Sequence, residues 1–250
     1  MVPDGNFRRN PMMLPKALAF DVFGTVVDWH SGIARETAAF LASNLPSVSS
    51  GEFALQWRKL YAPAMRECIN EARGFVVLDT LHHETLQQLL TSHGLDVSRI
   101  QSEELWRLAH AWRRLDPWPD VPQGLVRLRE ARPVVTLSNA NVELMIAMNR
   151  YNGLQWDALL GAEFAQTYKP EPAAYLTTVD ALGLKPQQLC LVACHHSDLA
   201  AARDCGLTTA FVHRPMEYGG APAPDADYAQ DWDYEADSFI DLAQQLSPGM

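Results

Sequence analysis

The sequence predicts an α/β protein, in which a doubly wound parallel sheet carries a helical bundle inserted after its first strand. Three observations support this fold class. A short apolar strand stands near the start, a long stretch of helical periodicity follows it, and strands then alternate with helices through the second half. Alternation of this kind is typical of parallel sheets covered on both faces. The 250 residues can form one large core and a smaller inserted domain.

The first strand is expected at residues 17–20, a short apolar run that ends at Asp21. Gly24 and Thr25 indicate the turn after it. Open α/β sheets bind ligands beyond the carboxyl ends of their strands, so Asp21 stands where a ligand would lie. A turn aspartate that caps its own backbone is the alternative interpretation.

Helical periodicity then predicts four helices with little strand signal between them, at residues 32–45, 51–72, 78–94 and 102–115. Pro63 must kink or split the second helix. Asp79 or Thr80 is the candidate N-cap of the third. Together the four helices predict a compact bundle.

Three prolines between residues 116 and 124 end this helical segment. Beyond them the pattern alternates. Strands, each with its following turn, are expected at 133–140, 158–164, 189–198 and 208–214. Helices are expected at 123–131, 141–152, 171–183, 198–205 and 236–246. Right-handed crossovers would place the turns after all these strands at one edge of the sheet.

The composition excludes several function classes. The net charge is −10 and no Lys/Arg cluster occurs, so we expect no nucleic-acid binding. An acidic protein can still bind a small anion through a few local cations. No apolar run approaches the ~20 residues that a membrane span needs. Residues 1–13 are interpreted as a flexible leader rather than a secretory signal.

The four cysteines, at positions 68, 190, 194 and 205, form no Cys-x-x-Cys pair. Their scatter favours reduced thiols and therefore a cytoplasmic protein. Metal ligation by Cys194 with His195 and His196 is the alternative use of one of these thiols. Adjacent residues at a strand end diverge, and no second ligand pair has the spacing of a zinc site, so no metal is expected.

Polar side chains follow several of the predicted strands. They are Asp21 with Thr25, Ser138 with Asn139, Lys169, and Asp198. Each has a structural explanation taken singly, as a helix cap or a solvated lysine. Their occurrence at successive strand ends favours one shared site.

With these four segments the chain resembles the haloacid dehalogenase superfamily. The motifs FDVFGTVVD, LSN, YKP and SDLAAAR match in order, and the resemblance spans roughly residues 15–220. It implies a Rossmann-like core domain at 14–32 and 119–250, with a helical cap domain at 33–118. It also implies that Asp21 is a covalent nucleophile.

Two positions distinguish the branches of this superfamily. Phosphatases carry a second aspartate two residues after the nucleophile, where this chain has Phe23, which cannot donate a proton. Their Mg²⁺ is held by an acidic residue four positions before Asp198, where this chain has Cys194, a soft ligand. A halide departs as a stable anion and needs neither group. A Mg-dependent phosphatase acting on a small phosphate ester stays the alternative, as does a binding protein without catalysis.

The motifs FDVFGTVVDW, QWRKLY and YKPEPAAY are similar to those of type II 2-haloacid dehalogenases. The resemblance implies hydrolysis of short 2-haloacids such as chloroacetate, L-2-chloropropionate and fluoroacetate to 2-hydroxy acids, through an ester on Asp21 and without metal or cofactor. It implies that Arg58 and Asn139 stabilise the halide. Ser138 and the backbone N–H groups of Val22 and Phe23 would hold the substrate carboxylate.

The remaining roles also follow from the resemblance. Lys169 keeps Asp21 ionised, Asp198 orients or deprotonates the water, and Tyr175 anchors the cluster. Thr25 bonds the nucleophile or its turn. The apolar wall is expected from Phe23, Trp57 and Trp29.

The last motif departs from the family, because Ala193 and His195 replace a serine and an asparagine. His195 could donate a hydrogen bond in place of that asparagine, act as a base, or be structural. A homodimer is expected, since dimers are common in the family.

Overall fold

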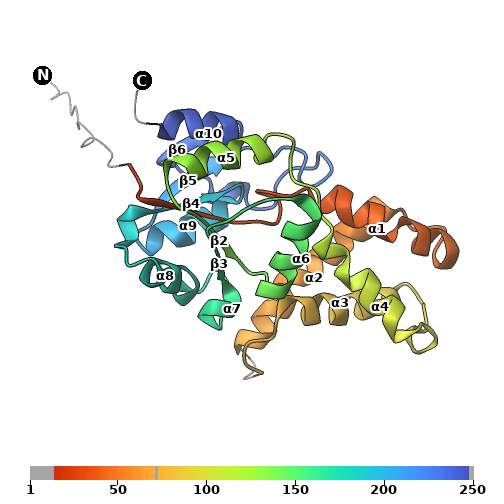
Figure 1. Cartoon of the computed structure of the whole chain (residues 1–250). Coiled ribbons are helices and arrows are strands. Elements are labelled where there is room, and N and C mark those ends of the chain that lie inside the picture. Colours follow the sequence, from red (N-terminus) through yellow and green to blue (C-terminus); the bar gives the residue numbers. More distant parts are fainter. Residues whose placement is uncertain (1–13, 71–72, 248–250) are drawn as a thin grey trace, which may run out of the picture.

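The computed structural model describes residues 14–70 and 73–247, so the predicted leader at 1–13 lies outside the described residues. At its centre is a six-stranded sheet in which every neighbouring pair is parallel. The strand order is β3-β2-β1-β4-β5-β6 (Figure 1). The strands are β1 (Ala17–Phe20), β2 (Val134–Ser138), β3 (Ala158–Gly161), β4 (Leu189–Ala193), β5 (Thr208–Val212) and β6 (Tyr234–Ala236).

The register of the central strands positions the site. Phe20, the last residue of β1, pairs with Thr136 of β2 on one side and with Val192 of β4 on the other. Parallel strands end at the same edge, so the residues that follow β1, β2 and β4 emerge side by side. Asp21 therefore lies between the two neighbouring turns, at the common edge of the sheet that the sequence predicts.

Helices cover both faces of the sheet (Figure 1). Leu18 and Phe20 of β1 pack on one face with α5 (Val121–Ala131), α6 (Val142–Asn152) and α10 (Phe239–Leu246). Ala17 and Ala19, which point the other way, pack with α8 (Pro172–Ala181) and α9 (His196–Asp204). A strand buried on both faces reads as a continuous apolar run, which explains the sequence of β1. The doubly wound fold is confirmed.

The helical bundle follows β1 and ends before α5 and β2, as predicted. It contains α1 (Trp29–Asn44), α2 (Ser50–Asn70), α3 (Leu78–Ser92), α4 (Ser102–Ala109) and the 3₁₀ turn η2 (His110–Arg113). The helix α2 continues through Pro63 without a break in its assignment, so Pro63 does not split it. The helix α1 begins at Trp29, ahead of the predicted domain boundary at residue 33.

One predicted cap is wrong. The residue that precedes α3 is Val77, and neither Asp79 nor Thr80 caps the helix. Asp79 instead accepts hydrogen bonds from Arg113 at 2.8 Å and from the Asn141 side chain at 2.9 Å. Asn141 belongs to the core and Asp79 to the bundle. This buried polar cluster therefore ties the two parts together.

The strand β6 was not predicted, because it lies in an acidic tail that lacks a long apolar run. The last predicted helix, at 236–246, is confirmed as α10, which begins at Phe239 and ends at Leu246. Between β3 and α8 lies the short helix α7 (Ala162–Ala165). In the described part of the chain, no helix combines the length and the apolar character that a membrane crossing requires.

Candidate active site

Asp21 lies directly beyond β1 and is 7 % exposed. Its backbone N–H donates to the carbonyl of Val192, which extends the pairing with β4 by one residue. The carboxylate receives hydrogen bonds on both oxygens. Lys169 Nζ lies 2.9 Å from Oδ1, and Thr25 Oγ1 lies 2.8 Å from Oδ2. The backbone of the strand and side chains from distant segments thus fix this carboxylate.

Lys169 joins two carboxylates. Its ammonium also donates to Asp198 Oδ2, and the other oxygen of Asp198 accepts the hydroxyl of Tyr175 at 2.6 Å. The backbone N–H of Lys169 donates to Asn139 Oδ1 at 2.8 Å. Residues predicted from three separate motifs therefore meet at one place, as expected for turns at a common sheet edge.

The electrostatics of this cluster favour charged side chains. Burial disfavours the carboxylate of Asp21, but Lys169 and His195 outweigh that effect and hold the pKa of Asp21 far below its ordinary value. Burial likewise disfavours the ammonium of Lys169, but Asp198 and Asp21 raise its pKa above the ordinary value. Asp21 is thus an ionised, partly desolvated carboxylate at neutral pH, as a carboxylate nucleophile must be.

The turn after β1 is held from several directions. Thr25 Oγ1 accepts the backbone N–H of Cys194 at 2.9 Å and donates to Asp21. The carbonyl of Thr25 accepts Arg214 Nε at 3.0 Å, and Arg214 pairs with Asp120 through two hydrogen bonds. Gly24 has a φ of +94°, a conformation that suits glycine.

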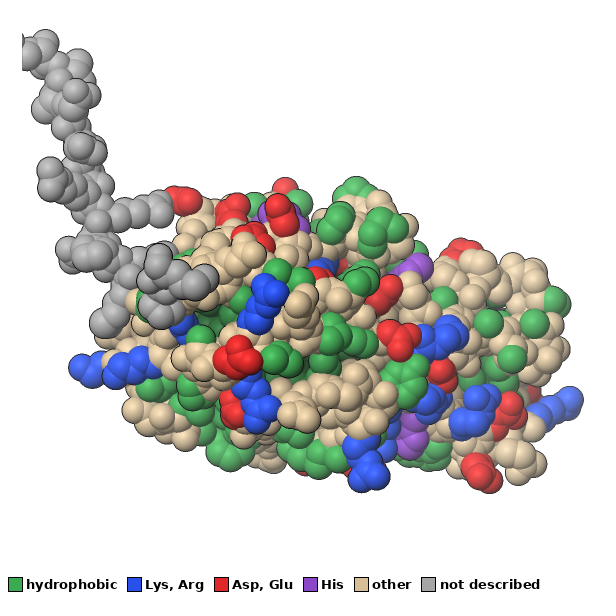
Figure 2. Space-filling view, turned by 45° about the horizontal axis from the view of Figure 1, so that its top comes forward, with side chains coloured by type: hydrophobic (Ala, Val, Ile, Leu, Met, Phe, Trp, Pro, Cys, Tyr) green, Lys and Arg blue, Asp and Glu red, His purple; other side chains and the backbone are tan. Residues whose placement is uncertain are grey.

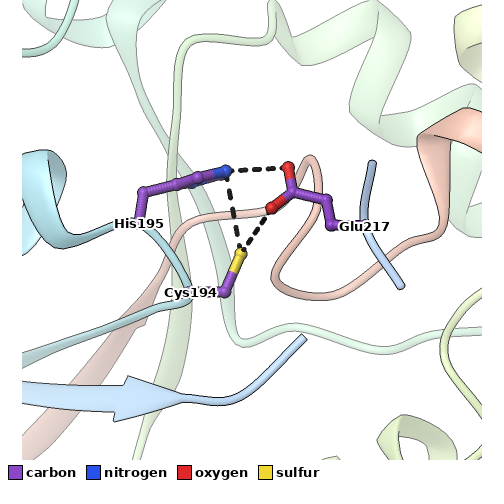
Figure 3. Close-up of side chains that lie close together, drawn as sticks. All are labelled: Cys194, His195 and Glu217. Carbon is purple, nitrogen blue, oxygen red and sulfur yellow. Dashed lines mark hydrogen bonds and ion pairs between the residues drawn. The ribbon is translucent and has the colours of Figure 1, made fainter. Parts of the chain in front are cut away.

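His195 connects Asp21 to a buried carboxylate that sequence reasoning missed. Its Nδ1 lies 3.2 Å from Asp21 Oδ2, and its Nε2 lies 2.8 Å from Glu217 Oε1. Glu217 is 2 % exposed and comes from the loop after β5. Figure 3 shows His195 and Cys194 both directed toward the Glu217 carboxylate. The pKa of the His195 imidazole is lowered by burial but raised more by Cys194, Glu217 and Asp21.

Cys194, His195 and Glu217 also form the one group of three side chains, among the described residues, whose ligand atoms are close enough to hold a metal ion. Their sulfur, nitrogen and oxygen donors would suit Zn²⁺ rather than Mg²⁺. The donors already bond one another, with the Cys194 thiol 3.3 Å from Glu217 Oε2. Burial and Glu217 raise the pKa of Cys194 to about 11, which keeps its proton in place.

The bundle contributes a cation above the site. The guanidinium of Arg58 on α2 lies 4.3 Å from the centre of the Tyr61 ring and 5.6 Å from that of Trp29. These are cation–π distances. Burial lowers the pKa of Arg58, but Tyr61, Tyr218, Glu217 and Asp21 raise it further, so the group stays charged.

Phe23, two residues after Asp21, points into an aromatic cluster of the bundle. Its ring lies 5.5 Å from Trp112, 6.3 Å from His82 and 6.5 Å from Tyr61. Trp57 contributes to this cluster, 5.7 Å from Trp112, and its indole N–H donates to Thr85. Phe23 and Trp57 therefore belong to one aromatic cluster, and the wall that they would form around a substrate stays a prediction.

Two polar members of the cluster are unpartnered. Both ring nitrogens of His82 and the indole nitrogen of Trp112 are buried without a hydrogen-bond partner among the described residues. The rings stack at 4.4 Å. Burial and Arg58 hold the pKa of His82 well below its usual value, so the ring is neutral. Buried donors without partners are costly, and they mark a place where a bound group would be stabilised.

Ser138, at the end of β2, and Val22, which follows Asp21 in the chain, are both buried. The Ser138 hydroxyl oxygen accepts the backbone N–H of Ala140 at 3.1 Å, which orders the turn after β2. Asn139, next to it, is bonded to the backbone of Lys169.

The residues that sequence reasoning missed are Glu217, Tyr61, His82, Trp112 and Arg214. Glu217 and Arg214 lie in a loop without apolar periodicity, so no motif indicates them. His82 and Trp112 sit at helical spacing within the bundle and read as ordinary core residues. Only proximity in the fold identifies them.

Comparison with known proteins agrees with this geometry. A model of the haloacid dehalogenase-like hydrolase family matches residues 15–206. The fold is similar to that of a defluorinating L-2-haloacid dehalogenase, at 42 % identity and a TM-score of 0.89, over 93 % of this chain and 95 % of that one. A second L-2-haloacid dehalogenase is 39 % identical, with a TM-score of 0.86, over 93 % and 100 % of the two chains.

Two further relatives complete the comparison. The (S)-2-haloacid dehalogenase 4A of Burkholderia cepacia is 29 % identical over 215 residues, which are 83 % of this chain and 88 % of that protein. The L-2-haloacid dehalogenase of Xanthobacter autotrophicus, with chloropropionic acid covalently bound, is 24 % identical and has a TM-score of 0.78 over 94 % and 98 % of the two chains. The second likeness shows the fold alone. The chain belongs to the haloacid dehalogenase-like hydrolases, within which its relatives are enzymes that act on carbon–halogen bonds.

Proposed function

We propose that this hydrolase removes the halogen from short L-2-haloacids through an ester on Asp21, without a metal ion. The observation that carries the proposal is the carboxylate of Asp21, ionised by Lys169 and facing a turn in which Phe23 stands where a phosphatase has its proton donor. A dehalogenase of this fold holds chloropropionic acid covalently bound, which supports a covalent intermediate.

The first step is displacement at C2 by one oxygen of Asp21. A bond forms between that oxygen and C2, and the carbon–halogen bond breaks with its electron pair leaving on the halide. Arg58 and Asn139 stabilise the halide as its charge develops. A single displacement inverts C2, so an L-2-haloacid gives a D-2-hydroxy acid.

The substrate is held by groups at the neighbouring strand ends. The Ser138 hydroxyl and the backbone N–H groups of Val22 and Phe23 bind its carboxylate. The aromatic cluster excludes water from the reacting carbon, which favours attack by a carboxylate. In the second step, water oriented by Asp198 attacks the carbonyl carbon of the Asp21 ester, and Tyr175 anchors Asp198 for that role.

The phosphatase alternative has less support. The ammonium of Lys169 bridges Asp21 and Asp198, so both carboxylates already have a cation at bonding distance. Cys194, four residues before Asp198, offers a thiol to Glu217 rather than an oxygen to Mg²⁺. Phosphoryl transfer depends on such a metal to neutralise charge.

The decisive experiment measures halide release from L- and D-2-chloropropionate by the wild type and Asp21→Asn, with a metal chelator present. We expect release from the L-substrate only, and a loss of about 10⁴-fold or more in the variant. A single turnover in ¹⁸O-water should place the label first in Asp21. Phosphate release from an aryl phosphate that requires Mg²⁺ would instead favour the phosphatase.

Fluoroacetate is a second candidate substrate. A protein that is 42 % identical to this chain is described as a defluorinating L-2-haloacid dehalogenase. Fluoride is a strong hydrogen-bond acceptor, and Arg58 offers a charged donor for it. Fluoride release from fluoroacetate, compared with chloride release from chloroacetate, tests this assignment.

We also propose that the protein is cytoplasmic and forms a homodimer. Each subunit would have a core domain at 14–32 and 119–250 and a cap domain at 33–118. All four cysteines are free thiols, which supports a location in a reducing compartment. The face shown in Figure 2 mixes apolar and charged side chains. Light scattering on the purified protein tests the dimer, and limited proteolysis near residues 33 and 118 tests the boundaries.

A further inference from the structure

Glu217 and His195 form a buried charged pair that the steps above do not use. Glu217 accepts three hydrogen bonds: from His195 Nε2 and Trp29 Nε1 on Oε1, at 2.8 and 2.9 Å, and from the Cys194 thiol on Oε2 at 3.3 Å. Three donors that converge on one buried carboxyl group favour its ionised form. Its pKa is raised by burial but lowered more by His195.

The hydrogen-bond partners of His195 determine the protonation state of its ring. Its Nδ1 faces the carboxylate of Asp21 and its Nε2 faces that of Glu217. Carboxylates only accept hydrogen bonds, so both ring nitrogens must carry a hydrogen. His195 is therefore a donor at Nδ1 and cannot serve as a base while both contacts persist.

The two oxygens of Asp21 differ in their partners. Oδ1 has Lys169 Nζ at 2.9 Å, whereas Oδ2 has two donors, Thr25 Oγ1 at 2.8 Å and His195 Nδ1 at 3.2 Å. The oxygen with fewer donors is the freer nucleophile. Attack by Oδ1 makes Oδ2 the carbonyl oxygen of the ester, and two donors already face that oxygen. Thr25 lies within the range of about 2.7–3.1 Å at which donors stabilise an oxyanion, and His195 lies just beyond it.

We propose that His195, fixed by Glu217, stabilises the oxyanion on Asp21 Oδ2 during hydrolysis of the ester. This inference rests on the proposed function and assigns its second step. Water attacks the Asp21 carbonyl carbon, and the π pair of the C=O bond moves onto Oδ2, where Thr25 and His195 bind it. One water proton passes to Asp198.

When the intermediate collapses, the pair on Oδ2 re-forms the C=O bond and the bond from carbon to Oδ1 breaks. The departing alkoxide takes the proton from Asp198 and leaves as the hydroxy acid. Asp21, left as a carboxylic acid, releases its remaining proton to solvent. His195 keeps both of its protons throughout, so the resting state is restored.

The turn at Gly24 is shaped for this pair. A Cβ placed on Gly24 would lie 2.2 Å from Oε1 of Glu217, so only glycine leaves room for the carboxylate. Trp29, at the start of α1, completes the bonding of the same oxygen. Elements from both ends of the chain therefore converge to hold His195 against the nucleophile.

The test separates the two steps with L-2-chloropropionate. The chloride released in a rapid-quench experiment measures ester formation, and the steady-state rate measures the whole cycle. Mass spectrometry of the intact protein detects the ester. We expect His195→Ala to keep a burst of one chloride per subunit, to turn over about 10²–10³-fold more slowly and to accumulate the ester. His195→Asn, which keeps a donor, should recover to within about tenfold of wild type.

Glu217→Gln tests the positioning role, since it removes the charge and keeps the shape. We expect ester to accumulate in this variant too, with slower turnover and an intact burst. His196→Asn is the control, because His196 stacks on Phe211 and accepts from Trp232, away from Asp21. It should show wild-type turnover and no accumulated ester.

The outcomes separate this inference from the proposed function. Equal slowing of the burst and of turnover in His195→Ala would overturn the inference, as would unchanged turnover. If that variant fails to fold, absence of ester in Glu217→Gln overturns it. A wild type that yields neither chloride nor ester refutes the proposed function instead.

Discussion

The two sides of the active site are built differently. On the core side, charged groups pair with one another at short distances, and we call this set the charged network: Asp21, Lys169, Asp198, His195 and Glu217. On the bundle side, one cation lies among aromatic rings, and we call this set the aromatic wall: Phe23, Trp57, Arg58, Tyr61, His82 and Trp112. The first side is saturated with hydrogen bonds and the second keeps donors unpartnered.

This difference indicates that the charged network stabilises the fold, whereas the aromatic wall is suited to binding a ligand. Buried charges that have partners are strongly coupled to folding, because loss of one partner strands the other. Buried donors without partners lower the stability of the free protein, and they stabilise a complex in which a bound ligand supplies an acceptor. We therefore expect changes in the charged network to lower both stability and activity. Changes in the aromatic wall should act chiefly on activity, except that removal of an unpartnered polar group should raise stability slightly.

Lys169→Met should have the largest effect. It leaves Asp21 and Asp198 buried without their shared cation, so we expect the free energy of unfolding to fall by about 3–5 kcal/mol and halide release to disappear. Urea denaturation at several pH values measures the first effect. The pKa of Asp21 is depressed in the wild type, so its stabilisation is present above the ordinary carboxyl range and is lost on acidification. The difference between the proteins should therefore narrow at acid pH.

Arg58→Gln should affect activity more than stability. Its guanidinium contacts the rings of Tyr61 and Trp29, and these contacts are worth about 1 kcal/mol to folding. Loss of its charge at the departing halide should lower kcat/KM by about 10²–10³-fold. Lys59→Gln, at the exposed next position, is the matched control and should leave halide release unchanged. A collapse of stability in Arg58→Gln would contradict the contrast between the two sides.

Gly24→Ala and Gly153→Ala form a matched pair. Both glycines have positive φ, at +94° and +76°, but a Cβ at Gly153 would meet nothing within 4 Å. The backbone cost alone is about 1–2 kcal/mol and should be the whole effect at Gly153. Gly24→Ala should cost more, because it displaces the carboxylate of Glu217. Thermal melts and turnover numbers for both variants measure the difference, and equal behaviour would show that Glu217 adapts freely.

His82→Phe should have the smallest effect and the opposite sign. It removes two buried nitrogens that lack partners and keeps a flat ring against Trp112. We expect the free energy of unfolding to rise by about 1 kcal/mol. A lower stability would mean that the imidazole has a partner such as ordered water. Chemical denaturation of the two proteins side by side provides the measurement.

The sequence predicted the fold and singled out every member of the charged network except Glu217, for one physical reason. Short apolar strands followed by single polar residues are local patterns, and parallel topology brings the ends of those strands together. Asp21, Lys169 and Asp198 each follow such a strand or its connection, so their meeting could be expected before the structure was known. The strand β1 and the helices after β2 and β4 could be predicted for the same reason, because each has a local sequence pattern.

Glu217 could not be predicted in this way. It lies in an irregular loop far along the chain from Asp21, and a glutamate beside glycines reads as exposed. Its burial results from the contact of that loop with Trp29 at the start of α1, which depends on tertiary packing. The unpartnered state of His82 also depends on neighbours in three dimensions, since helical spacing alone marks it as a core residue. The sequence shows which residues follow the end of a strand, but it does not show which residues a loop buries when it packs against the rest of the protein.

The imidazolium of His195 balances the charges of the ionised groups at the active site. Three anions, on Asp21, Asp198 and Glu217, face three cations, on Lys169, Arg58 and His195. A 2-haloacid adds one negative charge, and alkylation transfers one from the enzyme to the halide without altering the total. Ester formation is thus an internal redistribution of charge, so its rate should be insensitive to salt concentration, whereas substrate capture and halide escape should respond to it.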